Sequence, residues 1–278
     1  MSGYKVRKLK EKVFLGLVGT LVVLMFLPLF HIVYSVFKNG IHVILNRGIT
    51  FITGTLSEGG IGPAILGTLF LTLLASLMGL SVGFFVGVYA YEYPKSILGR
   101  ATKFLLQIML EFPTILVGVF VMQILVVPMG TYSTLAGALA LAIIMIPYVA
   151  VYTHEAMRQI PFAYREAAFS LGVTRVKAVF RILVPMAKRG ILTGFLIGIA
   201  KVAGETAPLL FTVGGSYETY QIGIGKPVGA IPLLIYNLIQ SPAREHHEIA
   251  WGASLILLLI FFGIFIPVRL SLREVRML

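Results

Sequence analysis

Six long apolar runs, separated by shorter polar connections, dominate the pattern of the chain. Each run is close to or above the roughly 20 residues that an α-helix needs to cross a hydrocarbon core about 30 Å thick. The pattern therefore predicts an all-α polytopic membrane protein with six transmembrane helices. The predicted spans are about 13–37, 63–91, 104–127, 135–153, 190–213 and 249–268.

Composition agrees with a membrane location and excludes a soluble globule. Of the 278 residues, 58% are hydrophobic and only 12% are charged, and the mean hydropathy is +0.94. Soluble domains average about 45–50% apolar and about 25% charged residues. The absence of cysteine excludes disulfides, thiolate metal sites and cysteine catalysis together. We expect a multi-pass protein of the cell membrane.

A net charge of +12 would suit a nucleic-acid partner, so the placement of the basic residues decides what it means. An even number of spans puts both termini on one side of the membrane, and 18 of the 23 Lys and Arg residues fall on that side. Cytoplasmic connections carry such an excess, so we expect both termini in the cytoplasm. Topology and contact with anionic membrane lipid then account for the charge, and nucleic acid is not an expected partner. The 18 residues are Lys5, Arg7, Lys8, Lys10, Lys12, Lys95, Arg100, Lys103, Arg158, Arg165, Arg175, Lys177, Arg181, Lys188, Arg189, Arg269, Arg273 and Arg276.

The first run follows basic residues, as the apolar segment of a signal peptide does. It is too long for such a segment, and no Ala precedes Ala64, so an A-x-A cleavage site is absent. We expect the run to stay as an anchor. The predicted organisation is a cytoplasmic segment, first span and outer loop over 1–62, a transmembrane domain over 63–270, and a cytoplasmic tail over 271–278.

The connection 154–189 is longer than joining two helices requires, and such loops usually have structure or function of their own. Pro161 suits a helix start and Gly172 a helix end, which predicts one short helix between them. Its apolar face comprises Tyr164, Ala167, Ala168 and Leu171, at helical spacing. A second helix should follow and end before Pro185. From spacing alone, the pair fits a helix lying on lipid, or a hairpin packed under its own spans.

A resemblance favours a different role for this connection. Its residues Glu166, Ala167, Ala168 and Gly172, followed by Ile182-Leu183-Val184-Pro185, resemble the EAA motif of ABC-importer permeases, with a slight departure around the final Pro. The resemblance implies that 154–189 is a coupling loop that docks into a groove on a cytoplasmic ATPase.

The resemblance extends over roughly residues 59–270, and this part of the chain is similar to phosphate-importer permeases of the PstA type. The segments that carry it are Gly59–Ile65, Tyr91-Glu92-Tyr93, Glu111–Ile115 with Gly118, Gly190–Gly194 and Gly204–Thr212. It implies the type I ABC-importer permease fold and three partners: a second, PstC-like permease, a PstB-like ATPase dimer and a PstS-like phosphate-binding protein. One position departs from the family, because Lys201 stands where Arg is usual; the charge is kept but the bidentate fork of Arg is lost.

Two charged residues inside the fifth run are the principal candidates for a translocation site. A charge within a span costs at least about 2.5–3.5 kcal/mol on insertion scales, so such residues are functional candidates. Lys201 and Glu205 are four residues apart, which places them on one helix face within reach of each other. We expect them to line or gate a phosphate path; the alternative is a structural ion pair.

Two further residues are candidates for the same path. Glu111 precedes Pro113 in the third run, where a proline-induced kink could turn it toward a polar interior or leave it near the cytoplasmic interface. Thr206 could donate its hydroxyl to a passing oxyanion, although span Thr residues often bond their own backbone.

Other chemistry has little support in the sequence. The stretch His246-His247-Glu248 lacks the spacing of a metal-binding helix, and we expect no metal. Gly223-Ile224-Gly225-Lys226 is no phosphate loop, because Tyr220 occupies the place of its first Gly. The expectation is a permease subunit that is not an enzyme and binds no cofactor, with ATP used by a partner ATPase. Alternatives are a permease for sulfate or molybdate, or a secondary transporter or channel; an intramembrane hydrolase has no candidate catalytic residues.

Overall fold

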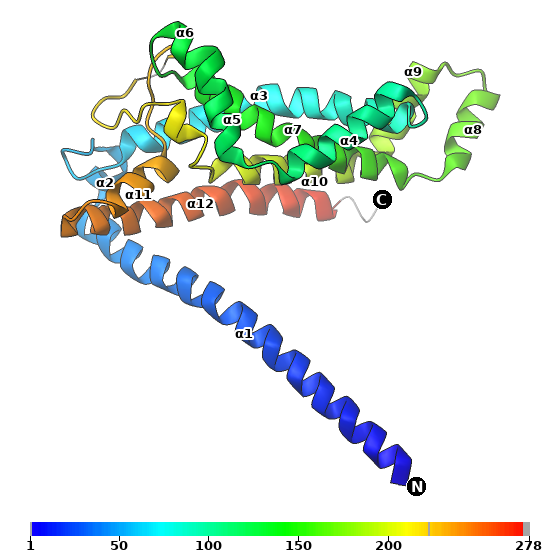
Figure 1. Cartoon of the computed structure of the whole chain (residues 1–278), viewed down its shortest axis with the longest axis horizontal. Helices are drawn as coiled ribbons and strands as arrows, with labels where there is room; N and C mark the ends of the chain where they lie inside the picture. Colours follow the sequence, from blue (N-terminus) through cyan, green and yellow to red (C-terminus); the bar gives the residue numbers. More distant parts are fainter. Residues whose placement is uncertain (1, 222, 275–278) are drawn as a thin grey trace.

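The computed structural model describes residues 2–221 and 223–274, which form a bundle of long helices joined by short ones (Figure 1). We name the end of the bundle that carries α8 and α9 the α8 end, and the opposite end, which carries α2 and α11, the α2 end. The helical elements are α1 (Ser2–Arg47), α2 (Ile49–Thr53), α3 (Gly62–Glu92), α4 (Ile97–Glu111), α5 (Thr114–Val121), the π-helical turn η1 (Met122–Val126), α6 (Val127–Met129), α7 (Thr134–Arg158), α8 (Phe162–Ser170), α9 (Arg175–Ala178), the π-helical turn η2 (Val179–Leu183), α10 (Val184–Ala203), the 3₁₀ turn η3 (Leu209–Phe211), α11 (Ile231–Ile239) and α12 (Arg244–Glu274).

Within the described residues, five continuous helices are long and apolar enough to cross a membrane, and a bent pair of helices is a sixth candidate span. The bent pair is the predicted third span, which the structure shows to be two helices, α4 and α5–α6, meeting at 103°. The bend falls at Phe112-Pro113, where Pro113 lacks an amide donor and Phe112 adopts an extended ψ of 131°. The kink expected at Pro113 is thus a complete break in the helix.

Helix α7 is the centre of the bundle and lies between α3 and α10. Glycines at every fourth position of α3 face α7, and α10 presents a second such row from the other side. A Cβ at Gly83 would lie 2.7 Å from the Cβ of Val149, and one at Gly194 would lie 2.5 Å from the Cβ of Tyr152. Without side chains at these positions the backbones approach closely, as in small-residue contacts between membrane helices. The rows are Gly79, Gly83 and Gly87 on α3, and Gly190, Gly194 and Gly198 on α10.

The fifth span begins earlier and ends earlier than the apolar run predicts. A continuous helical stretch runs from Arg175 to Ala203 through α9, η2 and α10. The predicted helix end before Pro185 is therefore wrong, because the π-helical turn η2 shifts the hydrogen-bond register just ahead of the proline, where its missing amide is tolerated. The α-helix stops at Ala203, so 204–213, although apolar, is a turn containing the 3₁₀ element η3.

Helix α1 joins the bundle at the α2 end only. Near Gly40 it touches α12, where an added Cβ would lie 2.6 Å from the Cβ of Leu255. Toward its N-terminus it diverges from the bundle, and its most apolar window has no buried residue (Figure 1). The last part of the predicted tail, 275–278, lies outside the described residues.

The long connection 214–230 folds over the α2 end. The amides of Thr134 and Leu135, at the start of α7, donate to the carbonyls of Lys226 and Ile224. Tyr217 packs against the cluster beneath this connection, and its burial raises the pKa of its hydroxyl. The described part of this connection, 214–221 and 223–230, is therefore held against the bundle by hydrogen bonds and packing.

Candidate functional site

Lys201 and Glu205 form an ion pair where α10 ends. Lys201 lies in the last turn of α10, and Glu205 lies two residues beyond its end; Nζ and Oε1 are 2.5 Å apart. The side chain of Glu205 is only 10% exposed and that of Lys201 is 35% exposed. The two residues are within reach of each other, as their spacing predicts, but the expectation of one continuous helix face is wrong because Gly204 ends the helix between them.

The break between α4 and α5 borders this pair. Thr114, the first residue of α5, donates its hydroxyl to Oε2 of Glu205 at 3.3 Å. Close packing holds the two segments together, because a Cβ at Gly118 would lie 2.6 Å from the Cα of Pro208. A cavity of about 320 Å³ follows the break and has Thr114 and Tyr148 in its otherwise largely apolar lining.

The other two predicted path residues lie differently. Glu111 is exposed at the end of α4, and it makes no hydrogen bond or ion pair to Lys201 or Glu205 in the described part of the chain. Thr206 is half-buried beside Glu205, and its carbonyl accepts the amides of Leu209 and Leu210. Thr206 is therefore next to the pair along the chain, and Glu111 lies before the break, at the end of α4.

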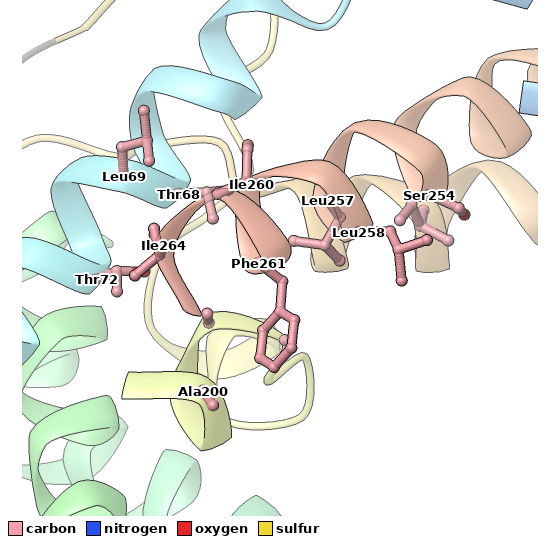
Figure 2. A pocket seen from close by; sticks show the side chains of 13 residues that line it. Thr68, Leu69, Thr72, Ala200, Ser254, Leu257, Leu258, Ile260, Phe261 and Ile264 are labelled. Carbon is pink, nitrogen blue, oxygen red and sulfur yellow. The ribbon is translucent and has the colours of Figure 1, made fainter. Parts of the chain in front are cut away.

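A second cavity, of about 280 Å³, lies between α3, α10 and α12 (Figure 2). Thr68, Thr72 and Ser254 supply its hydroxyl groups, and the remaining lining is apolar. The hydroxyl of Thr68 is already used, because it donates to the carbonyl of Ala64 and accepts the amide of Ile231. No charged side chain lines this cavity, so it does not resemble an anion site.

Among the described residues, no group of three or more His, Asp or Glu side chains could hold a metal ion.

In the loop between α7 and α10, the first helix, α8, has the limits that its sequence predicts. Helix α8 begins directly after Pro161 and ends ahead of Gly172, whose φ of +73° suits glycine. Ala168 is buried, but Tyr164 and Leu171 are exposed, and so are Glu166 and Ala167. The predicted apolar face therefore does not pack under the spans of this chain.

Exposed apolar side chains continue from α8 onto α9. The side chains of Phe162, Leu171 and Val176 are between 66% and 83% exposed. Pro185, the last residue of the predicted motif, lies inside the continuous helix rather than at an end. The loop thus presents an uncovered apolar surface at the α8 end.

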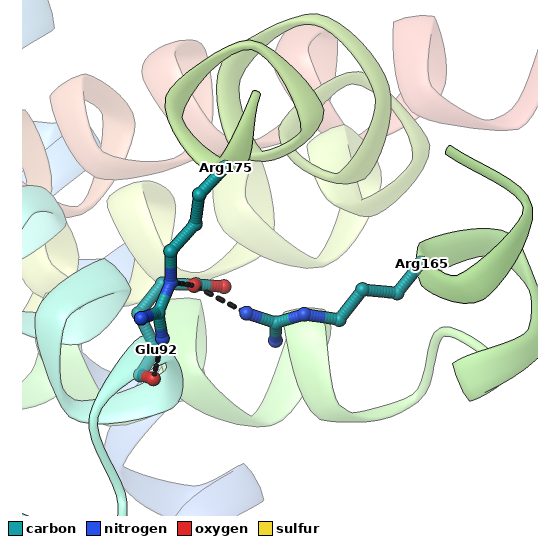
Figure 3. Close-up of polar contacts among 3 residues, drawn as sticks. All are labelled: Glu92, Arg165 and Arg175. Atoms are coloured by element: carbon teal, nitrogen blue, oxygen red, sulfur yellow. Dashed lines mark hydrogen bonds and ion pairs between the residues drawn. The ribbon is translucent and has the colours of Figure 1, made fainter. Parts of the chain in front are cut away.

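Glu92 is a site residue that was not predicted from the sequence. It ends α3, and its side chain is only 4% exposed. Its Oε2 accepts hydrogen bonds from Arg165 on α8, at 2.5 Å, and from Arg175 on α9, at 2.8 Å (Figure 3). The available signal was an acidic residue at the end of a span in a chain with only 11 acidic residues.

Comparisons with known proteins agree with this architecture. Residues 79–276 match the family described as binding-protein-dependent transport system inner membrane component. The chain is 63% identical over 269 residues to the probable phosphate transport system permease protein PstA of Methanocaldococcus jannaschii, covering 97% of this chain and 96% of that protein. It is 38% identical to the phosphate transport system permease protein PstA of Pasteurella multocida, covering 94% and 96%. An inward-facing structure of the MetNI methionine ABC transporter superposes with a TM-score of 0.65 at 21% identity, covering 77% of this chain and 95% of that one.

Proposed function

This chain belongs to the family of binding-protein-dependent transport system inner membrane components, and we propose that it is the permease subunit of an ATP-driven importer of inorganic phosphate. The observation that carries the proposal is the 63% identity to a phosphate permease over almost the whole of both chains. It is a multi-pass membrane protein with the fold of type I ABC-importer permeases. The subunit forms part of a path through the membrane and catalyses no bond chemistry.

Such a permease works with an ATPase and with a second permease. We assign these roles to a PstB-like ATPase dimer and a PstC-like permease, with a PstS-like protein delivering phosphate. The exposed apolar residues of α8 and α9 support docking of the ATPase on the loop 154–189. Glu166 and Ala167 are exposed there, while the buried Ala168 and the turn at Gly172 shape the loop from within. The uncovered length of α1 leaves a surface for the second permease or for lipid.

The orientation follows from charge and is part of the proposal. The α8 end, which carries most of the basic residues, faces the cytoplasm together with both termini. The α2 end then faces the binding protein. The chain itself binds no cofactor, and ATP is used only by the partner ATPase.

Lys201 and Glu205 are assigned to the path as an exchangeable ion pair. A phosphate anion that displaces Glu205 gains the positive charge of Lys201, and Glu205 regains it when the anion leaves. An unpaired charge is most costly at Glu205, which is only 10% exposed against 35% for Lys201. The exchange keeps Lys201 paired at each stage, and the displaced Glu205 keeps the hydroxyl of Thr114 as its hydrogen-bond donor. Thr114 donates its hydroxyl to Glu205, and Thr206, the next residue after Glu205, is assigned as a further hydroxyl donor to the anion. Glu111 is exposed on this chain. We assign it to the path as a residue that becomes part of the path lining when the second permease packs against the exposed end of α4.

Transport by a reconstituted complex tests this function. The chain, its candidate partner permease, the ATPase and the binding protein are placed in liposomes, and uptake of labelled phosphate is followed with and without ATP. We expect uptake that needs both ATP and the binding protein and that persists in excess sulfate or molybdate. Uptake without ATP would indicate a channel or secondary transporter, and competition by sulfate would indicate a different oxyanion as substrate; either result contradicts the proposal.

A further inference from the structure

The carboxylate of Glu92 holds both arms of the coupling loop at a single oxygen. Its Oε2 accepts one hydrogen bond from Arg165 and one from Arg175, and these two arginines lie on opposite sides of the turn at Gly172 (Figure 3). Hydrogen bonds between ionised groups are stronger than neutral ones, and this carboxylate is almost fully shielded from water. We call these three residues the Glu92 triad.

Further contacts fix the orientation of each guanidinium group. Arg175 also donates from Nη2 to the main-chain oxygen of Glu92, at 2.5 Å, so it caps a free carbonyl at the end of α3. Its Cζ lies 4.3 Å from the ring centroid of Tyr93. The Cζ of Arg165 lies 5.8 Å from the ring centroid of Tyr91 and 5.7 Å from that of Phe169. Cation–π contacts of this kind help to fix the orientation of each guanidinium group, of which that of Arg165 is the more shielded from water.

The triad joins two helices that extend away from the loop. Glu92 is the last residue of α3, which the glycine row containing Gly83 holds against α7. Arg175 is the first residue of the continuous helix that ends at Ala203. Lys201 lies in the last turn of that helix, about 40 Å from Arg175 at 1.5 Å per residue.

We infer that Glu92 is a positioning residue that makes the coupling loop move as one body with α3 and with the Arg175–Ala203 helix. Displacement of α8 by the ATPase is then transmitted to both helices together, and so to the Lys201–Glu205 pair. Without the carboxylate, Arg165 and Arg175 are left as two neighbouring positive charges, and α8 moves without α3. This inference rests on the proposed function, because it assumes that an ATPase acts on the loop.

Replacing Glu92 by Gln tests the inference, since the change keeps the size of the side chain and removes its charge. We expect the complex to assemble and hydrolyse ATP, while the phosphate transported per ATP falls about tenfold, the range of a typical coupling free energy. A purely structural role would lower the amount of complex without changing that ratio. The matched control is Glu11→Gln, which removes an exposed carboxylate on α1, outside the loop 154–189, and should leave the ratio unchanged.

A cross-link decides the question if the Gln variant fails to assemble. The chain has no cysteine, so Glu92→Cys with Arg165→Cys places the only two thiols of this subunit at the joint. A bifunctional thiol reagent should restore coupled transport to the double variant and have no such effect on either single variant. Loss of transport in the assembled, cross-linked complex would overturn the inference, as would an unchanged ratio in Glu92→Gln. A parent complex that transports no phosphate would instead count against the proposed function.

Discussion

Glu92 and Arg175 are bonded twice, once through the carboxylate, at 2.8 Å from Nε, and once through the main-chain oxygen of Glu92, although they are 83 positions apart. The double contact ties the end of α3 to the start of the helix that leads to Lys201. Such a bond between helix termini resists separation more than a single exposed ion pair, because one partner is almost fully buried.

The double change Lys201→Met with Glu205→Leu separates a path role from a structural one. Replacing both members of a shielded ion pair by apolar residues of similar volume is often nearly neutral for stability, whereas removing one costs up to about 3–5 kcal/mol. We therefore expect the double variant to assemble normally and to transport no phosphate. Uptake at the parent rate would show that the pair is structural.

Lys201→Arg is the milder companion to that experiment. The substitution keeps the positive charge and introduces the fork of donors that suits phosphate. If phosphate is stabilised by the positive charge at position 201, most of the phosphate uptake should remain. Uptake as low as in the double variant would contradict a role based on charge.

Gly172→Val tests the turn of the coupling loop. The φ of +73° strains any β-branched residue, although no atom lies within 4 Å of an added Cβ, so the cost of about 1 kcal/mol or more is one of backbone conformation. We expect weaker co-purification of the ATPase and lower uptake in a chain that still reaches the membrane. Gly225→Val is the control, because that loop glycine also has open space but no positive φ.

Gly83→Ala tests the packing of α3 on α7. An added Cβ would lie 2.7 Å from the Cβ of Val149, which forces the helices apart and should lower stability by about 1–3 kcal/mol, as overpacking does. Thermal unfolding in detergent measures the effect. Gly263→Ala, on α12 with no atom near its added Cβ, should leave the melting temperature unchanged or slightly raised.

Cysteine labelling tests the orientation of the chain. The sequence has no cysteine, so a single introduced thiol reports on one position. With the α8 end in the cytoplasm, Ser170→Cys should resist an impermeant thiol reagent in intact cells, and Thr219→Cys should react. Both positions are exposed on this chain, so the difference measures sidedness. Labelling of Ser170→Cys from outside would reverse the topology and remove the ATPase from the coupling loop.

The sequence by itself determined what depends on short stretches of chain. Apolar runs predicted the positions of the five continuous candidate spans and of the bent pair, because burial in hydrocarbon needs only enough consecutive apolar residues. Pro161 and Gly172 predicted the limits of α8 through the backbone angles that these residue types favour. The spacing of four predicted contact between Lys201 and Glu205, and that contact forms even though the helix ends between them.

Only the tertiary structure decided where helices end inside an apolar run and which distant residues meet. Hydropathy marks the apolar segment 190–213 but does not distinguish a helix from a buried turn, because both can be apolar; the helix stops at Ala203. The contact of Thr114 with Glu205 joins residues 91 apart, and that of Glu92 with Arg165 joins residues 73 apart. These contacts follow from the break at Pro113 and from the glycine rows that allow the helices to pack closely. A local sequence pattern does not specify how far apart two helices lie, so it could not predict these contacts.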